Sequence, residues 1–142
     1  MSSTNKKNEE NTLMRIGYWS IRGLGAPCRM MTMYAGVKAK FDVYDVKPKV
    51  GGGWDASSWF GPKKELKKIN PLMNLPYVID NDVIVNQTNA VMTYLGRKLN
   101  LWGTSSSECL ACEQLLVRCK SLFSRIYRLL DHNRTYSVKF TT

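Results

Sequence analysis

The sequence predicts an α/β fold, in which a domain of alternating strands and helices is followed by one long helix. Two observations predict this arrangement. Apolar runs of strand length alternate with apolar residues at helical spacing over residues 13–100. A continuous amphipathic helical pattern then covers residues 108–130, and its apolar stripe needs a partner surface.

The first elements of the chain form a strand–helix–strand unit. The apolar run 13–19 predicts a short buried strand, and the glycine-containing loop 20–27 leads from it into a helix over 28–36. Alternating apolar residues predict a second strand over 40–46. Because a helix connects the two strands, we expect them to pair in parallel.

A long glycine-rich segment follows the second strand. Residues 48–62 predict a loop, with at most one helical turn over 55–60. Loops of this length inside a compact domain are usually functional or disordered. Trp54 and Trp59 argue against disorder. We therefore expect an ordered loop with a functional role.

The domain ends with a hairpin and a helix. Residues 74–80 predict a third strand, and 83–85 return as its hairpin partner. Thr88 is a plausible cap for the helix that continues over 90–99. The resulting order of strand, helix, strand, loop, strand, strand and helix is that of a thioredoxin-like domain.

These patterns divide the chain into four segments. We expect a polar, disordered tail, a thioredoxin-like domain, a linker and the start of an all-α domain, over residues 1–12, 13–100, 101–107 and 108–142. The tail lacks the apolar core of a signal peptide, and no apolar run is long enough to span a membrane. The default compartment is therefore the cytosol, and no membrane partner is expected.

The net charge of +10 permits a nucleic acid, a membrane surface or small anions as partners. The cations are scattered along the chain and no nucleic-acid motif accompanies them, so a nucleic-acid partner is not expected. A solvated basic surface and an anionic small substrate both remain open.

Cys109 and Cys112 form a lone C-x-x-C inside a helical pattern, so we expect free thiols and no metal site.

Three motifs together resemble the mu class of glutathione transferases, segment by segment and in order. They are Gly17-Tyr-Trp-Ser-Ile-Arg-Gly-Leu24, Met73-Asn-Leu-Pro-Tyr-Val-Ile-Asp80 and Asn86-Gln-Thr-Asn-Ala-Val-Met-Thr-Tyr-Leu-Gly-Arg-Lys98. The resemblance covers residues 14–103 well and continues more weakly into the long helix. It implies a thioredoxin-like domain that binds glutathione as co-substrate, without another cofactor, and transfers its sulfur to an apolar electrophile.

The resemblance also implies roles for single residues. Tyr18 matches the tyrosine that activates the thiol, because a hydroxyl that donates a hydrogen bond favours the thiolate. The matching glutathione-binding residues are Trp19, Leu24, Trp59, Lys63, Asn74, Leu75, Pro76, Gln87 and Thr88. The Leu75–Pro76 bond is expected to be cis. Gln87 and Thr88 would hold the γ-glutamyl end, and Trp59 with Lys63 the glycyl carboxylate, for which Lys64 is a rival.

Other positions depart from the class. Ser121 stands where the class has an aspartate that reaches the glutathione of the partner subunit. Leu72 stands where the class has a bulky aromatic residue that inserts into the partner subunit. Asp131 stands where the class has a tyrosine that assists the electrophile site. Most of the later helices of the family have no counterpart in this sequence. The resemblance therefore implies a dimeric transferase, but a glutathione-binding protein with little turnover and an inactive fragment both remain open.

Overall fold

The computed structural model describes residues 13–137, in two compact units that divide between Leu101 and Trp102. The tail predicted to be disordered, residues 1–12, lies outside the described residues. The first unit contains β1 (Met14–Trp19), α2 (Gly25–Tyr34), β2 (Ala39–Tyr44), β3 (Lys47–Pro48), β4 (Trp54–Asp55), α3 (Ser57–Ile69), β5 (Tyr77–Asp80), β6 (Val83–Asn86) and α4 (Thr88–Lys98). The second unit contains α5 (Ser106–Ser137).

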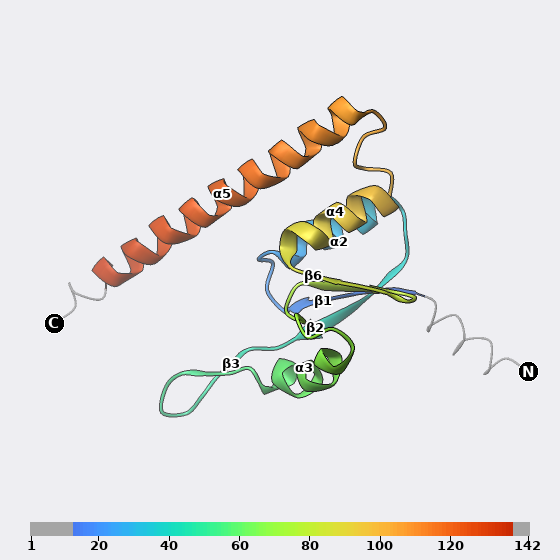
Figure 1. Cartoon of the computed structure of the whole chain (residues 1–142). Coiled ribbons are helices and arrows are strands. Elements are labelled where there is room, and N and C mark those ends of the chain that lie inside the picture. Colours follow the sequence, from blue (N-terminus) through green and yellow to red (C-terminus); the bar gives the residue numbers. More distant parts are fainter. Residues whose placement is uncertain (1–12, 138–142) are drawn as a thin grey trace, which may run out of the picture. The chain divides into compact units, whose positions relative to one another are not determined.

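A four-stranded mixed sheet forms the centre of the first unit (Figure 1). Its strand order is β2-β1-β5-β6. The pairing of β1 with β2 is parallel, as predicted, and β5 runs antiparallel to both β1 and β6. This arrangement confirms the thioredoxin-like fold.

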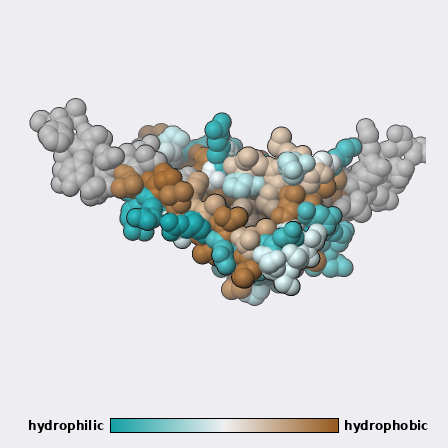
Figure 2. Space-filling model, turned by 90° about the horizontal axis from the view of Figure 1, so that it is seen from above, coloured by the Kyte–Doolittle hydropathy of each residue, from teal (hydrophilic) through white to brown (hydrophobic). Residues whose placement is uncertain are grey.

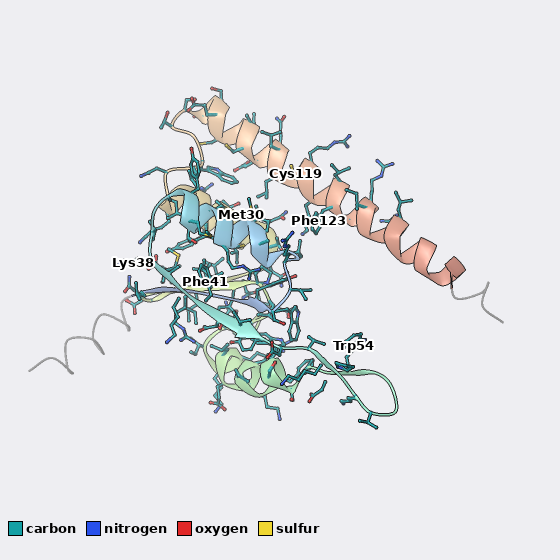
Figure 3. The ribbon with its side chains drawn as sticks, turned by 180° about the vertical axis from the view of Figure 1, so that it is seen from behind. Met30, Lys38, Phe41, Trp54, Cys119 and Phe123 are labelled. Atoms are coloured by element: carbon teal, nitrogen blue, oxygen red, sulfur yellow. The ribbon has the colours of Figure 1, made fainter. Side chains whose placement is uncertain are left out.

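Helices cover both faces of the sheet. In Figures 1 and 3, α2 and α4 lie on one face and α3 lies on the other. Successive residues of a strand point to opposite faces, so Met14 and Ile16 of β1 pack in the core with α2 and α4. The core on the α3 face consists of the buried residues Tyr44, Trp59, Met73 and Tyr77. The sheet therefore separates two small cores.

The prediction of a loop over residues 48–62 is wrong. The short strands β3 and β4 form a hairpin, and α3 begins directly after it at Ser57. Two features of the segment explain why a helix was not predicted there. Pro62 lies inside α3, where proline ordinarily disrupts a helix, and Trp59 is the only residue of α3 classed as buried. The glycine-rich start of the segment and Pro62 therefore favoured the prediction of a loop.

Two helix starts also differ from the predictions. The helix predicted over 28–36 begins earlier, at Gly25, which places Pro27 in its first turn, where a missing N–H costs little. At the start of α4 the cap residue is Gln87, and Thr88 is the first helical residue. The prediction that Thr88 caps this helix is therefore wrong.

The long helix α5 extends beyond its predicted range at both ends. It begins at Ser106 because Ser105 and Glu108 form a capping box. The Glu108 N–H donates to Ser105 Oγ at 3.2 Å, and the Ser105 N–H donates to Glu108 Oε2 at 2.9 Å. Among the described residues, no helix is long and apolar enough to cross a membrane. Apolar side chains do reach the surface, as brown patches beside teal ones in Figure 2.

Candidate functional site

The strand register brings most of the predicted site residues to one end of the sheet. Gly17 of β1 pairs with Tyr77 of β5, and Tyr77 pairs with Asn86 of β6. Beyond this row lie the end of β1, the entry to β5 and the start of α4. These three segments contain Tyr18 and Trp19, Asn74 to Pro76, and Gln87 with Thr88.

Tyr18 has a fixed hydroxyl. It lies at the end of β1, its side chain is buried, and its hydroxyl oxygen accepts a hydrogen bond of 3.0 Å from the backbone N–H of Leu24. That bond uses a lone pair and leaves the hydroxyl proton available. No acceptor for this proton lies among the residues that the structure describes. Tyr18 can therefore still donate to a ligand.

Two glycines that flank Leu24 allow the loop to approach Tyr18. A Cβ atom at Gly23 would lie 2.7 Å from the Tyr18 hydroxyl, and one at Gly25 would lie 2.4 Å from Cγ of its ring. Gly23 also has a φ of +33°. Only glycine fits at such distances, so both positions determine where the hydroxyl lies. The sequence predicted a glycine-containing loop here, but not the contact of these glycines with Tyr18.

The Leu75–Pro76 peptide bond is cis, as the resemblance implied. It directly precedes β5 and lies beyond the row formed by Gly17 and Tyr77. Pro76 is buried and Leu75 is half-buried, whereas Asn74 is exposed. A partly open backbone segment therefore lies next to the end of β1 that holds Tyr18.

The start of α4 has backbone N–H groups that no side chain caps. Gln87, the cap residue, is exposed, makes no side-chain cap hydrogen bond and has φ 73° and ψ 127°. A residue other than glycine rarely adopts this conformation, and such strain is common at functional sites. The Thr88 hydroxyl has no partner within the described part of the chain. An anion at this position would meet both the helix dipole and unpaired donors.

Trp59 and Lys63 lie together on α3. The Lys63 ammonium lies 5.6 Å from the centroid of the Trp59 ring, which is a cation–π distance. Trp59 is 1% exposed, and its ring meets that of Trp19 edge-on at 6.5 Å. The indole N–H has no hydrogen-bond partner among the described residues and is not fully enclosed. A positive charge and an unpaired donor therefore lie beside the end of β1.

A part-buried polar cluster on the α3 face was not predicted. We name it the strand-crossing cluster: Arg15, Asp42, Tyr44 and Tyr77. Burial is the main cause that raises the pKa values of Tyr44 and Tyr77, so both phenols stay neutral donors. Strand alternation puts Arg15 of β1 on the same face as Asp42 and Tyr44 of β2, and Tyr77 reaches them from β5. The sequence pattern held no signal for this pairing.

The structure describes the side chains of two of the three positions that depart from the class. Leu72 is 74% exposed. Ser121 is exposed on α5, and its hydroxyl donates to the Val117 carbonyl at 3.0 Å. The side chain of Asp131 lies outside the described part of the chain. The described residues contain no cluster of possible metal ligands, and all four cysteines are free.

Residues 14–97 match the family model described as the N-terminal domain of glutathione S-transferase. The chain belongs to the glutathione S-transferase family. A glutathione S-transferase of Tyrophagus putrescentiae is 38% identical over 114 residues, which cover 78% of this chain and 50% of that protein. Glutathione S-transferase Mu 6 of Mus musculus is 40% identical over 95 residues, 66% of this chain and 41% of the relative. Relatives of the Mu type agree with the resemblance seen in the sequence.

A solved structure supports the fold. The crystal structure of the glutathione S-transferase from Ascaris lumbricoides matches with a TM-score of 0.62 at 23% identity. The match covers 83% of this chain and 51% of that one. This glutathione S-transferase chain thus spans about half the length of the relatives it matches.

Proposed function

We propose that this chain binds glutathione at the described end of the sheet and transfers its sulfur to apolar electrophiles. The observation that carries the proposal is the Tyr18 hydroxyl. It accepts the Leu24 N–H at 3.0 Å, which fixes the oxygen and leaves the proton free to donate to a thiolate. A thiol is a weak nucleophile, and a donor aimed at the sulfur favours the charged, reactive form.

The remaining groups account for both ends of the tripeptide. The uncapped start of α4, with Gln87 and Thr88, suits the γ-glutamyl carboxylate. The backbone of Leu75, held by the cis bond to Pro76, suits the cysteinyl amides, as an extended peptide pairs with a strand edge. Asn74 is exposed beside it and adds a polar contact.

The glycyl carboxylate is assigned to Trp59 and Lys63. The cation–π distance between them supports Lys63 over its rival Lys64, which is exposed. The electrophile would enter at the border formed by Trp19 and Leu24, which are both half-buried. In the reaction the thiol gives its proton to water, and Tyr18 stabilises the charge of the resulting thiolate. The sulfur then forms a bond to the electrophilic carbon, and with an aryl halide the carbon–halogen bond breaks and the halide leaves with the bonding electron pair.

The variant Tyr18→Phe tests this assignment. We expect glutathione affinity to change little, the pKa of the bound thiol to rise, and turnover to fall on the order of 10²-fold, because one donor to the charged sulfur is lost. The ultraviolet absorbance of the thiolate, followed against pH, measures the thiol pKa. An unchanged value in the variant would remove Tyr18 from the mechanism.

A second function is favoured by the length of the chain. The match covers 50% of the Tyrophagus putrescentiae relative and 41% of the Mus musculus relative, so it supports glutathione binding more than it supports the turnover of the whole proteins. The chain would then bind glutathione or apolar ligands with little turnover. Calorimetric titration with glutathione measures binding, and an assay with an aryl halide measures turnover. Binding without turnover would favour the binding protein.

The cytosol is the proposed compartment. It supplies glutathione and keeps thiols reduced, and the four free cysteines are consistent with that environment. Fractionation of cells that express the chain, followed by detection of the chain in each fraction, tests this assignment.

A further inference from the structure

The strand-crossing cluster connects three strands through one carboxylate oxygen. Asp42 Oδ2 of β2 accepts hydrogen bonds from Arg15 Nε at 3.0 Å, from Arg15 Nη2 at 2.7 Å and from the Tyr77 hydroxyl at 2.7 Å. The hydroxyls of Tyr77 and Tyr44 lie 2.7 Å apart. Asp42 is thus the acceptor at the end of a chain of hydrogen bonds that holds both phenols.

Gly17 makes this crossing possible. It lies on β1 between its two pairing partners, Asp42 on β2 and Tyr77 on β5. A Cβ atom at Gly17 would lie 2.1 Å from Cε1 of Tyr77, so the Tyr77 ring passes over the strand where a side chain would otherwise stand. The glycine therefore lets a side chain of β5 reach a carboxylate on β2.

The two phenols that Asp42 holds are the rings that pack on Trp59. The Tyr77 ring stacks on the indole with centroids 6.0 Å apart and an angle of 22°. The Tyr44 ring lies 5.0 Å from it at 58°. Tyr77 is 0% exposed and Trp59 is 1% exposed, so neither ring can turn without moving the other. The hydrogen-bonded ends of the phenols thus determine the orientation of the indole.

We infer that Asp42 is a positioning residue, which acts through Tyr77 and Tyr44 to aim the Trp59 indole N–H at the C-terminal carboxylate of the bound thiol peptide. The inference rests on the proposed glutathione site. The protein would prefer a thiol peptide with a free C-terminal carboxylate over a peptide whose C-terminus is blocked. The inference assigns this preference to residues that lie outside the glutathione site. Without the acceptor at Asp42, the phenols and the indole lose their common orientation, and the carboxylate loses the indole N–H as one of its two donors.

Two titrations of the intact chain test this inference, one with glutathione and one with its C-terminal amide. For the unmodified protein we expect the amide to bind about tenfold more weakly, since a hydrogen bond to a charged group is lost. In Asp42→Ala, we expect this ratio to fall towards one, because the acid loses affinity and the amide does not. The control Asp45→Ala makes the same change of charge and size on an exposed neighbour and should keep the ratio.

A general loss of structure would weaken both ligands alike, so the ratio separates positioning from stability. Arg15 is 42% exposed and remains solvated in Asp42→Ala, which favours folding of the variant. If thermal melting nevertheless shows that it is unfolded, Tyr77→Phe removes one hydroxyl, keeps the ring and should lower the ratio in the same direction. Trp59→Phe should lower the ratio to the part that Lys63 contributes, and adding Asp42→Ala to it should change nothing further.

The outcomes separate the inference from the proposed function. A folded Asp42→Ala or Tyr77→Phe variant that keeps the full preference overturns the inference and leaves glutathione binding intact. An unmodified protein that binds glutathione and its amide equally also overturns it. An unmodified protein that binds neither ligand overturns the proposed function, and the inference with it.

Discussion

Tyr18 illustrates how single residues determine the chemistry of this site. Its hydroxyl oxygen is held by one backbone N–H, and its ring is enclosed by two glycines that leave no room for a side chain. Gly25 lies against the ring and Gly23 lies against the hydroxyl. Hydrogen-bond strength depends steeply on distance and angle, so displacement of the ring should affect the thiol more than it affects peptide binding.

Gly25→Ala tests the role of this contact. The new Cβ would lie 2.4 Å from the Tyr18 ring, so the ring must move. We expect turnover to fall roughly 10- to 10²-fold and the pKa of the bound thiol to rise, with a smaller change in glutathione affinity. Gly61→Ala is the control, because nothing lies within 4 Å of a Cβ at that position. Equal turnover in both variants would show that the approach of Gly25 does not position Tyr18.

Among the elements, α4 and α5 begin in opposite ways. At α5, Ser105 and Glu108 satisfy each other's backbone N–H groups, and Thr104 adds two further donors to Glu108. At α4, Gln87 makes no cap bond and its backbone is strained. A helix start that lacks a side-chain cap is suited to binding an anion, whereas a capped one is suited to stability.

The uncapped start of α4 predicts the effect of the substitution Thr88→Ala. Because Gln87 is the cap residue, we expect little change in the melting temperature. Loss of the hydroxyl contact should weaken glutathione binding by about 1 kcal/mol, or roughly fivefold, as measured by titration. Thr93→Ala, on the same helix but remote from its start, should leave affinity unchanged. A lower melting temperature with unchanged affinity would instead assign Thr88 a purely structural role.

The capping box makes the start of α5 sensitive to acid. Hydrogen bonds from the backbone N–H groups of Ser105 and Thr104 lower the pKa of Glu108 from 4.5 to about 2. A lowered pKa in the folded state means that the stabilisation is complete above pH 4.5 and is lost as the pH falls through 2. We expect helix content, measured by circular dichroism, to fall over this range.

Glu108→Gln isolates this effect, because the amide keeps an acceptor oxygen but has no proton to gain. The variant should lose less helix than the unmodified chain between pH 4.5 and 2. Glu113→Gln, outside the first turn of the same helix, serves as the control and should behave like the unmodified chain. Identical acid profiles for Glu108→Gln and the unmodified chain would show that the box does not contribute.

At the scale of the whole molecule, the long helix α5 carries exposed apolar side chains along one face. The leucines at positions 115, 122 and 129 of α5 recur every seven residues and are 64%, 57% and 67% exposed. Every seventh residue of a helix lies on the same face, so these side chains form one stripe. Large uncovered apolar patches promote association or aggregation. The longer relatives have further chain that is available to cover such a surface.

We therefore expect the chain to self-associate through this stripe at micromolar concentration, and to turn over far more slowly than a full-length relative. Sedimentation measures the association. Leu122→Lys should weaken it by placing a charge on the stripe, whereas Ser121→Lys adds the same charge to a neighbouring residue off the stripe and should not. A well-folded monomer with turnover equal to that of a full-length relative would contradict this prediction.

Local pattern alone determined much of this protein. The strand–helix–strand start, the parallel pairing of β1 with β2 and the hairpin of β5 and β6 follow from short-range periodicity and connection rules. The three motifs together indicated the family, and the resemblance implied the cis bond between Leu75 and Pro76. These features depend on residues close in sequence, which is why they could be predicted.

Only the tertiary structure decided α3 and the strand-crossing cluster. Asp42 and Tyr77 lie 35 residues apart in sequence, and they meet because two strand registers and the missing side chain of Gly17 coincide. Periodicity reports which face a residue occupies, but it does not report which distant residue lies opposite. The orientation of Trp59 depends on such pairings, because the packing of rings in a core is set by all of its neighbours together.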